Sequence, residues 1–125
     1  GWKICPQICY DLRFPVWIRN SEDYDLLLVL ANWPKPRINA WDTLLKARAI
    51  ENMCYTIGVN RVGIDNNHHQ YTGNSLIVDF LGNELSSLEN NEAGIIFGTL
   101  IKEELEKMRE KLGFLKDSDQ SRIQI

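Results

Sequence analysis

The chain has 125 residues, 44% of them hydrophobic and 25% charged, so it is long enough and apolar enough to bury a core. The formal net charge is −3, from 14 basic and 17 acidic residues, without a basic stripe. This balance disfavours nucleic acid and anionic membranes as partners. The longest apolar stretch, residues 26–31, is too short to cross a bilayer, so no membrane association is expected.

The first half of the chain predicts a parallel crossover unit. A strand is expected from Ile4 to Tyr10, ended by a run of polar and charged residues. Pro15 suits the first turn of a short helix that extends to about Asn20. Residues 25–31 are almost wholly apolar, which is typical of a central strand buried on both faces. Strand, helix and strand in this order indicate an α/β fold.

A longer helix is predicted after this second strand. Two prolines end the strand because they cannot donate to a sheet ladder. Asn39 is expected to cap a helix over residues 40–52. Toward its end the helix becomes polar, and we expect Arg48 and Glu51 to lie on a solvated face.

The second half of the chain predicts further strands and one more helix. Four strands are expected, over residues 55–62, 75–80, 84–88 and 93–98. A polar loop over residues 63–73 follows the first of them, and Gly82-Asn83 is a two-residue hairpin signal that implies antiparallel pairing. Thr99 is expected to cap a helix that Gly113 ends.

Cys9 is the candidate nucleophile, because it lies where a predicted strand ends and a helix follows. Open α/β sheets bind ligands and present nucleophiles on sharp turns at such positions. The alternative is that Cys9 is a small buried hydrophobe, as most free cysteines are. If the first two strands are neighbours, Trp33 lies at the same edge of the sheet. A thiol also needs a base nearby, and the candidates in this chain are Asp11, Glu51, His68 and His69.

The cysteines and histidines do not predict a metal site. Cys5, Cys9 and Cys54 lack paired metal-type spacing, and His68-His69 is expected in a solvated loop. Free thiols indicate a reducing compartment, so we expect a cytoplasmic protein. The chain opens directly into a strand without a starting Met, which indicates the middle of a longer protein. We expect one domain, or one half of one.

Residues 8–15, Ile-Cys-Tyr-Asp-Leu-Arg-Phe-Pro, closely resemble the nucleophile motif of the nitrilase superfamily, the carbon–nitrogen hydrolases. Further blocks match in the same order: Ala31-Asn32-Trp33-Pro34, residues 41–52, Gly58-Val59-Asn60-Arg61-Val62-Gly63, Tyr71-Thr72-Gly73-Asn74-Ser75 and the Gly82 turn. The resemblance covers essentially the whole chain and is strongest to the bacterial omega-amidase branch, in which Asn-Trp-Pro follows the strand after the nucleophile. It implies one half of a nitrilase-like α-β-β-α sandwich, assembled as a homodimer or larger homo-oligomer.

The resemblance also implies an activity. The family uses a Glu–Lys–Cys triad without a metal or an organic cofactor. An omega-amidase-like member would hydrolyse a small linear amide, an α-keto acid amide, to the α-keto acid and ammonia through an acyl-thioester. Cys9 would be the nucleophile and the backbone N–H of Tyr10 an oxyanion donor.

The substrate pocket implied by the resemblance involves three further residues. Asn32 and Trp33 would form pocket walls. Arg13 would either bind the carboxylate of an acidic substrate or brace the turn through an ion pair with Asp11 or Glu51. Both roles for Arg13 remain open from the sequence.

In the family, the glutamate and the lysine of the triad precede the cysteine, whereas only eight residues precede Cys9 here. Residues 1–125 are therefore expected to be the C-terminal part of a single carbon–nitrogen hydrolase domain and to be inactive alone. Two alternatives remain. One is a non-catalytic truncated fragment or dimerisation module, and the other is a Cys–His hydrolase that uses His68 or His69.

Overall fold

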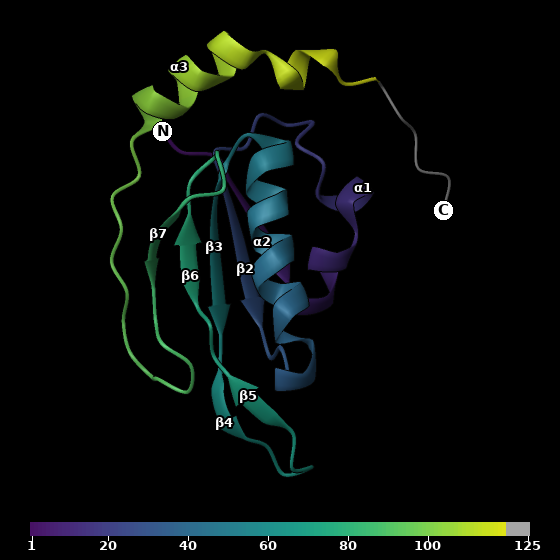
Figure 1. Ribbon diagram of the computed structural model, residues 1–125. Helices are drawn as coiled ribbons and strands as arrows, with labels where there is room; N and C mark the ends of the chain where they lie inside the picture. The colour runs from purple at the N-terminus through teal and green to yellow at the C-terminus, as the bar shows by residue number, and fades with distance from the viewer. Residues whose placement is uncertain (120–125) are drawn as a thin grey trace.

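The structure is a computed structural model that describes residues 1–119 (Figure 1). The strands are β1 (Ile4–Ile8), β2 (Leu26–Ala31), β3 (Tyr55–Asn60), β4 (Val62–Ile64), β5 (Gln70–Thr72), β6 (Leu76–Val78) and β7 (Glu84–Ser87). The helices are α1 (Pro15–Ile18), α2 (Ile38–Asn52) and α3 (Lys102–Leu112), with 3₁₀ helices η1 (Cys9–Arg13), η2 (Lys35–Arg37) and η3 (Phe114–Asp117). The mixture of a sheet and helices confirms the α/β fold class.

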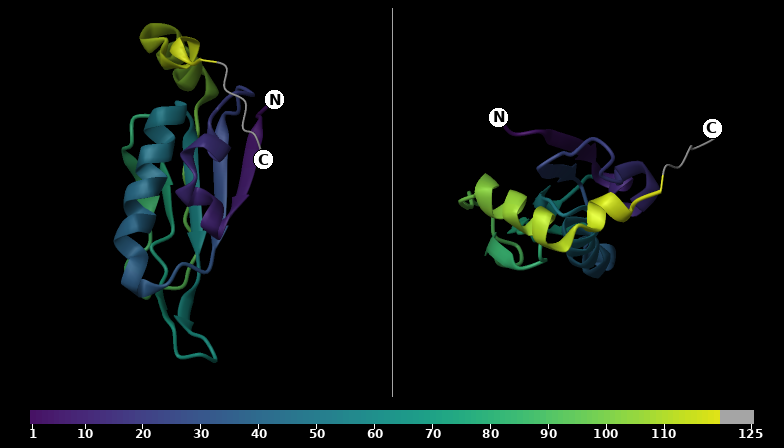
Figure 2. Two further views of the ribbon diagram at one scale, coloured as in Figure 1. Left: turned by 90° about the vertical axis from the view of Figure 1, so that its right-hand side faces the viewer. Right: turned by 90° about the horizontal axis from the view of Figure 1, so that it is seen from above.

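The main sheet has the order β1-β2-β3-β6-β7. Strands β1, β2 and β3 are parallel, so the predicted crossover unit is confirmed, and β6 and β7 add antiparallel pairing. Because the three parallel strands point the same way, their carboxyl ends meet at one edge of the sheet. The hairpin of β4 and β5 projects beyond this edge, whereas α3 crosses the opposite end (Figures 1 and 2).

Helix α2 covers one face of the sheet and creates the main core there (Figure 2, left). Leu27 and Val29 of β2 point into this core and are fully buried, as are Trp41 and Leu45 of α2. Residues of one strand alternate between the two faces, so their neighbours in β2 point away from α2.

The opposite face of the sheet is apolar and largely exposed. Ile8 pairs with Leu30, and Leu30 pairs with Val59, so the three side chains lie side by side. Their exposed fractions are 69%, 48% and 44%. The expectation that the second strand is buried on both faces is met only at its start within the described residues: on the face away from α2, Leu26 is buried beside Leu105 of α3, whereas Leu30 is exposed.

Asp25 fastens α3 to the start of the parallel strands. Its carboxylate accepts the Lys3 N–H at 2.8 Å and lies 3.0 Å from Lys102 Nζ and 3.4 Å from an Arg109 guanidinium nitrogen. Burial acts to raise the pKa of Asp25, but the Lys3 hydrogen bond and the two cations outweigh it and lower that pKa. A smaller cluster of Leu26, Tyr55, Phe80 and Leu105 packs beneath α3.

The chain beyond β3 differs from the prediction in three places. The polar loop over 63–73 contains the paired strands β4 and β5. Residues 79–83, rather than two residues, connect β6 to β7, because Asp79 accepts the Leu81 and Asn83 N–H groups and closes a wider turn. Residues 93–98 form no strand, since no described segment pairs with them, and Ile95 and Phe97 are exposed.

Both predicted helix caps are wrong. Helix α2 begins at Ile38, one residue before Asn39, and α3 begins at Lys102, well after Thr99. Neither helix has a side-chain cap at its N-terminus. Gly113 does end α3, with a left-handed φ of 67° that glycine adopts without a Cβ clash.

Candidate active site

Cys9 is held on a strained turn at the carboxyl end of β1. Its φ of 45° lies in the left-handed region, which costs a non-glycine residue roughly 1–3 kcal/mol and persists only where surrounding contacts fix it. One such contact is the Ile8 N–H, which donates to Asp11 Oδ2 at 3.0 Å. The Cys9 thiol is half-buried, with Sγ 4.0 Å from the Asn32 carbonyl oxygen. The segment therefore holds the Cys9 thiol on a sharp strand-to-helix turn, the geometry in which α/β folds present nucleophiles.

Tyr10 follows Cys9 in the first turn of η1, where backbone N–H groups have no acceptor within the helix. An N–H there is free to donate to an oxygen bound beside the thiol. The Tyr10 ring itself is exposed and packs edge-on against Phe14, with ring centroids 5.0 Å apart.

Three hydrogen bonds, with Asn60 and Arg37, hold Trp33 at the same edge of the sheet. Its backbone N–H donates to Asn60 Oδ1 at 2.7 Å, and Asn60 Nδ2 donates back to the Trp33 carbonyl at 3.0 Å. The indole N–H donates to the Arg37 carbonyl at 2.7 Å. Trp33 is only 2% exposed, so it forms a rigid wall.

Arg13 stacks on that wall. Its guanidinium carbon lies 4.8 Å from the centroid of the Trp33 ring, a cation–π arrangement. Neither proposed brace holds it, because Asp11 bonds to the Ile8 N–H and Glu51 pairs with Arg48 at 2.9 Å. Within residues 1–119, the ion-pair alternative for Arg13 is therefore wrong.

The residues expected at the site come together in one depression of about 450 Å³. It is lined by Cys9, Tyr10, Arg13, Asn32, Trp33, Pro34 and Arg37. The first five of these residues lie in the segments that follow β1 and β2, and these strands are parallel neighbours, so Cys9 and Trp33 lie at the same edge of the sheet. Small-molecule sites in proteins are typically concavities of this size, roughly 300–1,000 Å³.

Arg48 of α2 holds the backbone of the Cys9 turn through hydrogen bonds. Its guanidinium donates to the Leu12 carbonyl at 3.1 and 2.8 Å and pairs with Glu51 on its other side. The expectation that Arg48 lies on a solvated face is wrong, since it is 4% exposed. The Leu12 carbonyl emerges from a short 3₁₀ helix and needs a donor, which α2 supplies only once the elements pack.

The two adjacent histidines do not enter the depression that Cys9 lines. His69 Nδ1 lies 3.1 Å from Asp65 Oδ2 at the tip of the β4–β5 hairpin. His68 and His69 instead line a neighbouring depression, with Lys35 and Gln70. The structure thus provides no Cys–His pair between Cys9 and either histidine.

The remaining cysteines are placed for packing. Cys54 is fully buried, and burial raises the pKa of its thiol to about 12. Cys5 is half-buried against the main core. Within residues 1–119, no group of three or more His, Cys, Asp or Glu side chains is arranged to hold a metal ion. None of the helices in that range is long and apolar enough to span a bilayer.

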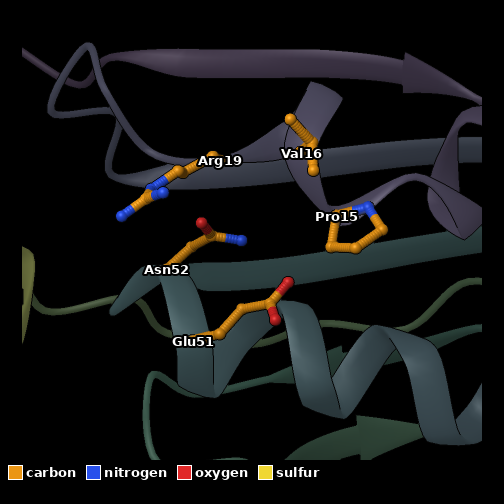
Figure 3. Close-up of a pocket in the computed structure, with 5 residues that line it drawn as sticks. All are labelled: Pro15, Val16, Arg19, Glu51 and Asn52. Atoms are coloured by element: carbon orange, nitrogen blue, oxygen red, sulfur yellow. The ribbon is translucent and has the colours of Figure 1, made fainter. Parts of the chain in front are cut away.

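A second groove lies between α1 and the end of α2, and Figure 3 shows its lining residues. They are Pro15, Val16, Arg19, Glu51 and Asn52. Two of its polar groups already have partners: Glu51 bonds to Arg48, and Asn52 accepts the Asn20 N–H at 2.9 Å. No thiol or hydroxyl lines it, and its one carboxylate, Glu51, is paired with Arg48, so the depression beside Cys9 remains the candidate active site.

The sequence did not identify three residues of the site region as functional candidates. Arg37 lines the depression, Asn60 locks the Trp33 loop, and Arg48 holds the Cys9 turn. Arg37 could have been noticed as a basic residue in the loop after the second strand. Nothing in the sequence pattern distinguishes Asn60 from an ordinary strand-ending asparagine.

Comparison with known proteins places these features in a family. The sequence profile of the family described as carbon-nitrogen hydrolase matches residues 1–110. The omega-amidase YafV of Yersinia enterocolitica is 52% identical over 119 residues, which are 95% of this chain and 46% of that protein. The 2-oxoglutaramate amidase of Bacillus subtilis is 38% identical over 119 residues, 94% of this chain and 45% of that protein.

A solved structure agrees with the sequence comparison. XC1258 from Xanthomonas campestris, described as a CN-hydrolase superfamily protein with an arsenic adduct in the active site, superposes with a TM-score of 0.95. It is 42% identical and covers 99% of this chain, which in turn covers 49% of XC1258. The chain thus spans about half the length of the relatives that it matches.

Proposed function

The chain belongs to the carbon-nitrogen hydrolase family, the nitrilase superfamily, and on that premise we propose that it is the nucleophile-bearing part of a cysteine-dependent amidase of the omega-amidase type. The observation that carries this proposal is the depression in which a strained Cys9, the Tyr10 turn, Arg13 and Trp33 face the same space. The substrate would be a small linear amide with an acidic group, such as an α-keto acid amide.

The proposed reaction has two steps at one sulfur atom. The Cys9 thiolate attacks the amide carbonyl, and the Tyr10 N–H stabilises the negative charge that develops on the oxygen. The C–N bond breaks, the departing NH2 group takes up the proton that the thiol gave up and leaves as ammonia, and an acyl-thioester remains on Cys9. Water then attacks the thioester, releasing the carboxylic acid and restoring the thiol.

Arg13, Asn32 and Trp33 would hold the substrate during both steps. Arg13 is already stacked on Trp33, which orients its planar fork for a carboxylate. Asn32 borders the same depression, and its carbonyl lies beside the Cys9 thiol. No metal or organic cofactor enters the proposed steps.

We also propose that residues 1–125 form the C-terminal part of one α-β-β-α sandwich domain. The exposed apolar face of Ile8, Leu30 and Val59 is the surface against which a second sheet would pack. The relatives are about twice as long, which leaves room for that sheet and for the glutamate and lysine of the triad. The free thiols Cys5, Cys9 and Cys54 suit a reducing compartment such as the cytoplasm.

A homodimer or larger homo-oligomer is proposed on the same basis. Val16, which lines the groove of Figure 3, and Trp17, which follows it in α1, are 58% and 59% exposed, and such apolar side chains favour association. Sedimentation velocity of the full-length protein tests this: dimers are expected, and a Trp17→Glu variant should shift toward monomer. Monomeric wild-type protein would contradict the proposed assembly.

Cys9→Ala in the full-length protein tests the assignment of the nucleophile. Ammonia release from 2-oxoglutaramate should be abolished, while circular dichroism and melting temperature stay close to wild type. Cys5→Ala is the matched control and should keep its activity, because Cys5 packs against the core. Retained turnover in the Cys9 variant would remove Cys9 from the mechanism.

The alternative of a non-catalytic fragment makes a separate prediction about thiol reactivity. In the proposed enzyme, Cys9 of the full-length protein should react with iodoacetamide far faster than Cys54, whose raised pKa keeps it protonated. Peptide mass spectrometry measures the labelled fraction at each site. Equal and slow labelling of both cysteines would favour the fragment.

A further inference from the structure

The charged residues that line the candidate depression are all basic. Two of its lining residues, Arg13 and Arg37, carry guanidinium groups, and none of them carries a carboxylate. Neither arginine takes part in any of the ion pairs found within residues 1–119. A concavity with one sign of charge attracts ligands of the opposite sign and binds them best where the charges converge.

A single tryptophan contacts the guanidinium of one arginine and the backbone of the other. The Arg13 guanidinium carbon lies 4.8 Å from the Trp33 ring centroid, and the indole N–H of Trp33 donates to the Arg37 carbonyl at 2.7 Å. The Arg37 N–H donates to the Pro34 carbonyl at 3.0 Å, which closes the η2 turn. Because Trp33 is itself locked by Asn60, the wall that carries both cations is rigid.

A second basic residue, Lys35, lies close to Arg37 but does not line the depression beside Cys9. Lys35 lies in the same turn, but it lines only the adjoining depression and donates to Gln70 Oε1 at 3.3 Å. Arg37 borders both depressions and is an exposed residue. The structure therefore separates a basic residue that lines the depression beside Cys9 from a basic residue on the same loop that does not.

We propose that Arg37 is a specificity-determining residue that binds, together with Arg13, the carboxylate at the far end of the amide substrate. The site then selects amides that carry a terminal carboxylate over neutral amides of the same length. This inference rests on the proposed amidase function and adds a second cation to it. Two planar guanidinium groups hold a carboxylate through charge-assisted hydrogen bonds and fix its distance from the thiol.

The test compares two substrates of equal chain length on the full-length protein. Glutaramate carries the carboxylate, and pentanamide replaces it with a methyl group. In Arg37→Gln, kcat/KM for glutaramate relative to that for pentanamide should fall about 10- to 100-fold, mainly through KM, as expected for the loss of a hydrogen bond to a charged group. Arg37→Lys should recover part of this preference, because it keeps the charge but loses the planar fork.

Lys35→Gln is the matched control and should leave the preference unchanged. An Arg37→Gln enzyme with the wild-type substrate preference would overturn the proposal. So would an equal loss on both substrates, because that result indicates a structural role for Arg37.

A binding measurement separates failure of this inference from failure of the proposed function. If the wild-type protein hydrolyses neither amide, the proposed function fails, and calorimetry with glutarate still tests the arginine pair. Glutarate should bind the wild type and Lys35→Gln at least about tenfold more tightly than Arg37→Gln. Equal glutarate affinity in all three proteins would overturn the role of Arg37 whether or not the amides are turned over.

Discussion

At the scale of single residues, the site depends on a buried arginine that does not touch the depression. Arg48 joins α2 to the Leu12 carbonyl with two hydrogen bonds, three residues beyond Cys9. The free-energy cost of burying its guanidinium is offset by the hydrogen bonds to the Leu12 carbonyl and by the ion pair with Glu51. Arg48 is therefore a positioning residue for the Cys9 turn.

Arg48→Met should destabilise the protein by about 2–3 kcal/mol, because the Leu12 carbonyl loses its donor while the site stays buried. Urea unfolding measures the change in free energy of unfolding. Glu51→Gln is the control and should cost less than about 1 kcal/mol, since this carboxylate is exposed to solvent. If the two variants lose equal stability, the Leu12 contact contributes nothing beyond the ion pair.

At the scale of elements, the β4–β5 hairpin is closed by one carboxylate. Asp65 accepts the N–H groups of Asn67 and His69 at 2.9 Å each, and the Tyr71 hydroxyl donates to it at 2.9 Å. Burial acts to raise the pKa of Asp65, but these hydrogen bonds and the one from the His69 ring outweigh it and lower the pKa to about 2. The charged carboxylate thus organises the hairpin beside the candidate site.

This lowered pKa predicts how the hairpin responds to acid. Its ordinary value is 3.8, so the stabilisation by charged Asp65 is complete above that pH and disappears as the pH falls toward about 2. Amide hydrogen exchange over residues 62–72 should accelerate in this range, and carbonyl NMR should show a midpoint for Asp65 near 2. In Asp65→Asn the acceleration should be absent. A midpoint at the ordinary value would show that the hydrogen bonds do not favour the charged form.

At the scale of the whole molecule, the sheet face away from α2 is covered by α3 at one end and is exposed at the other within the described residues. Ile8, Leu30 and Val59 form an apolar surface opposite α2, and Ile95 and Phe97 are exposed on the segment after β7. Contiguous exposed apolar surface of this kind marks an interaction site. It fits the proposal that a second sheet of the same polypeptide packs there.

Leu30→Glu should therefore have different effects on residues 1–125 alone and on the full-length protein. In residues 1–125 alone, the charge should reduce self-association, measured by light scattering. In the full-length protein, the same charge should be buried and should lower the free energy of unfolding by about 2–4 kcal/mol. Ile64→Glu, on the exposed β4 strand, is the control and should change stability little. Full stability of the Leu30→Glu full-length protein would show that this face stays exposed.

The sequence alone determined the α/β class, the parallel pairing that brings Cys9 and Trp33 to one edge, and the residues that match the family. Local signals suffice there, because apolar runs, prolines and the nucleophile motif act over a few neighbouring residues. Only the tertiary structure decided that Arg48 is buried beneath the turn and that Arg13 stacks on Trp33 rather than pairing with an acid. It also decided that Arg37 lines the depression beside Cys9 while Lys35 does not. These outcomes depend on partners far apart in the chain, and the choice among competing partners is made when the elements pack.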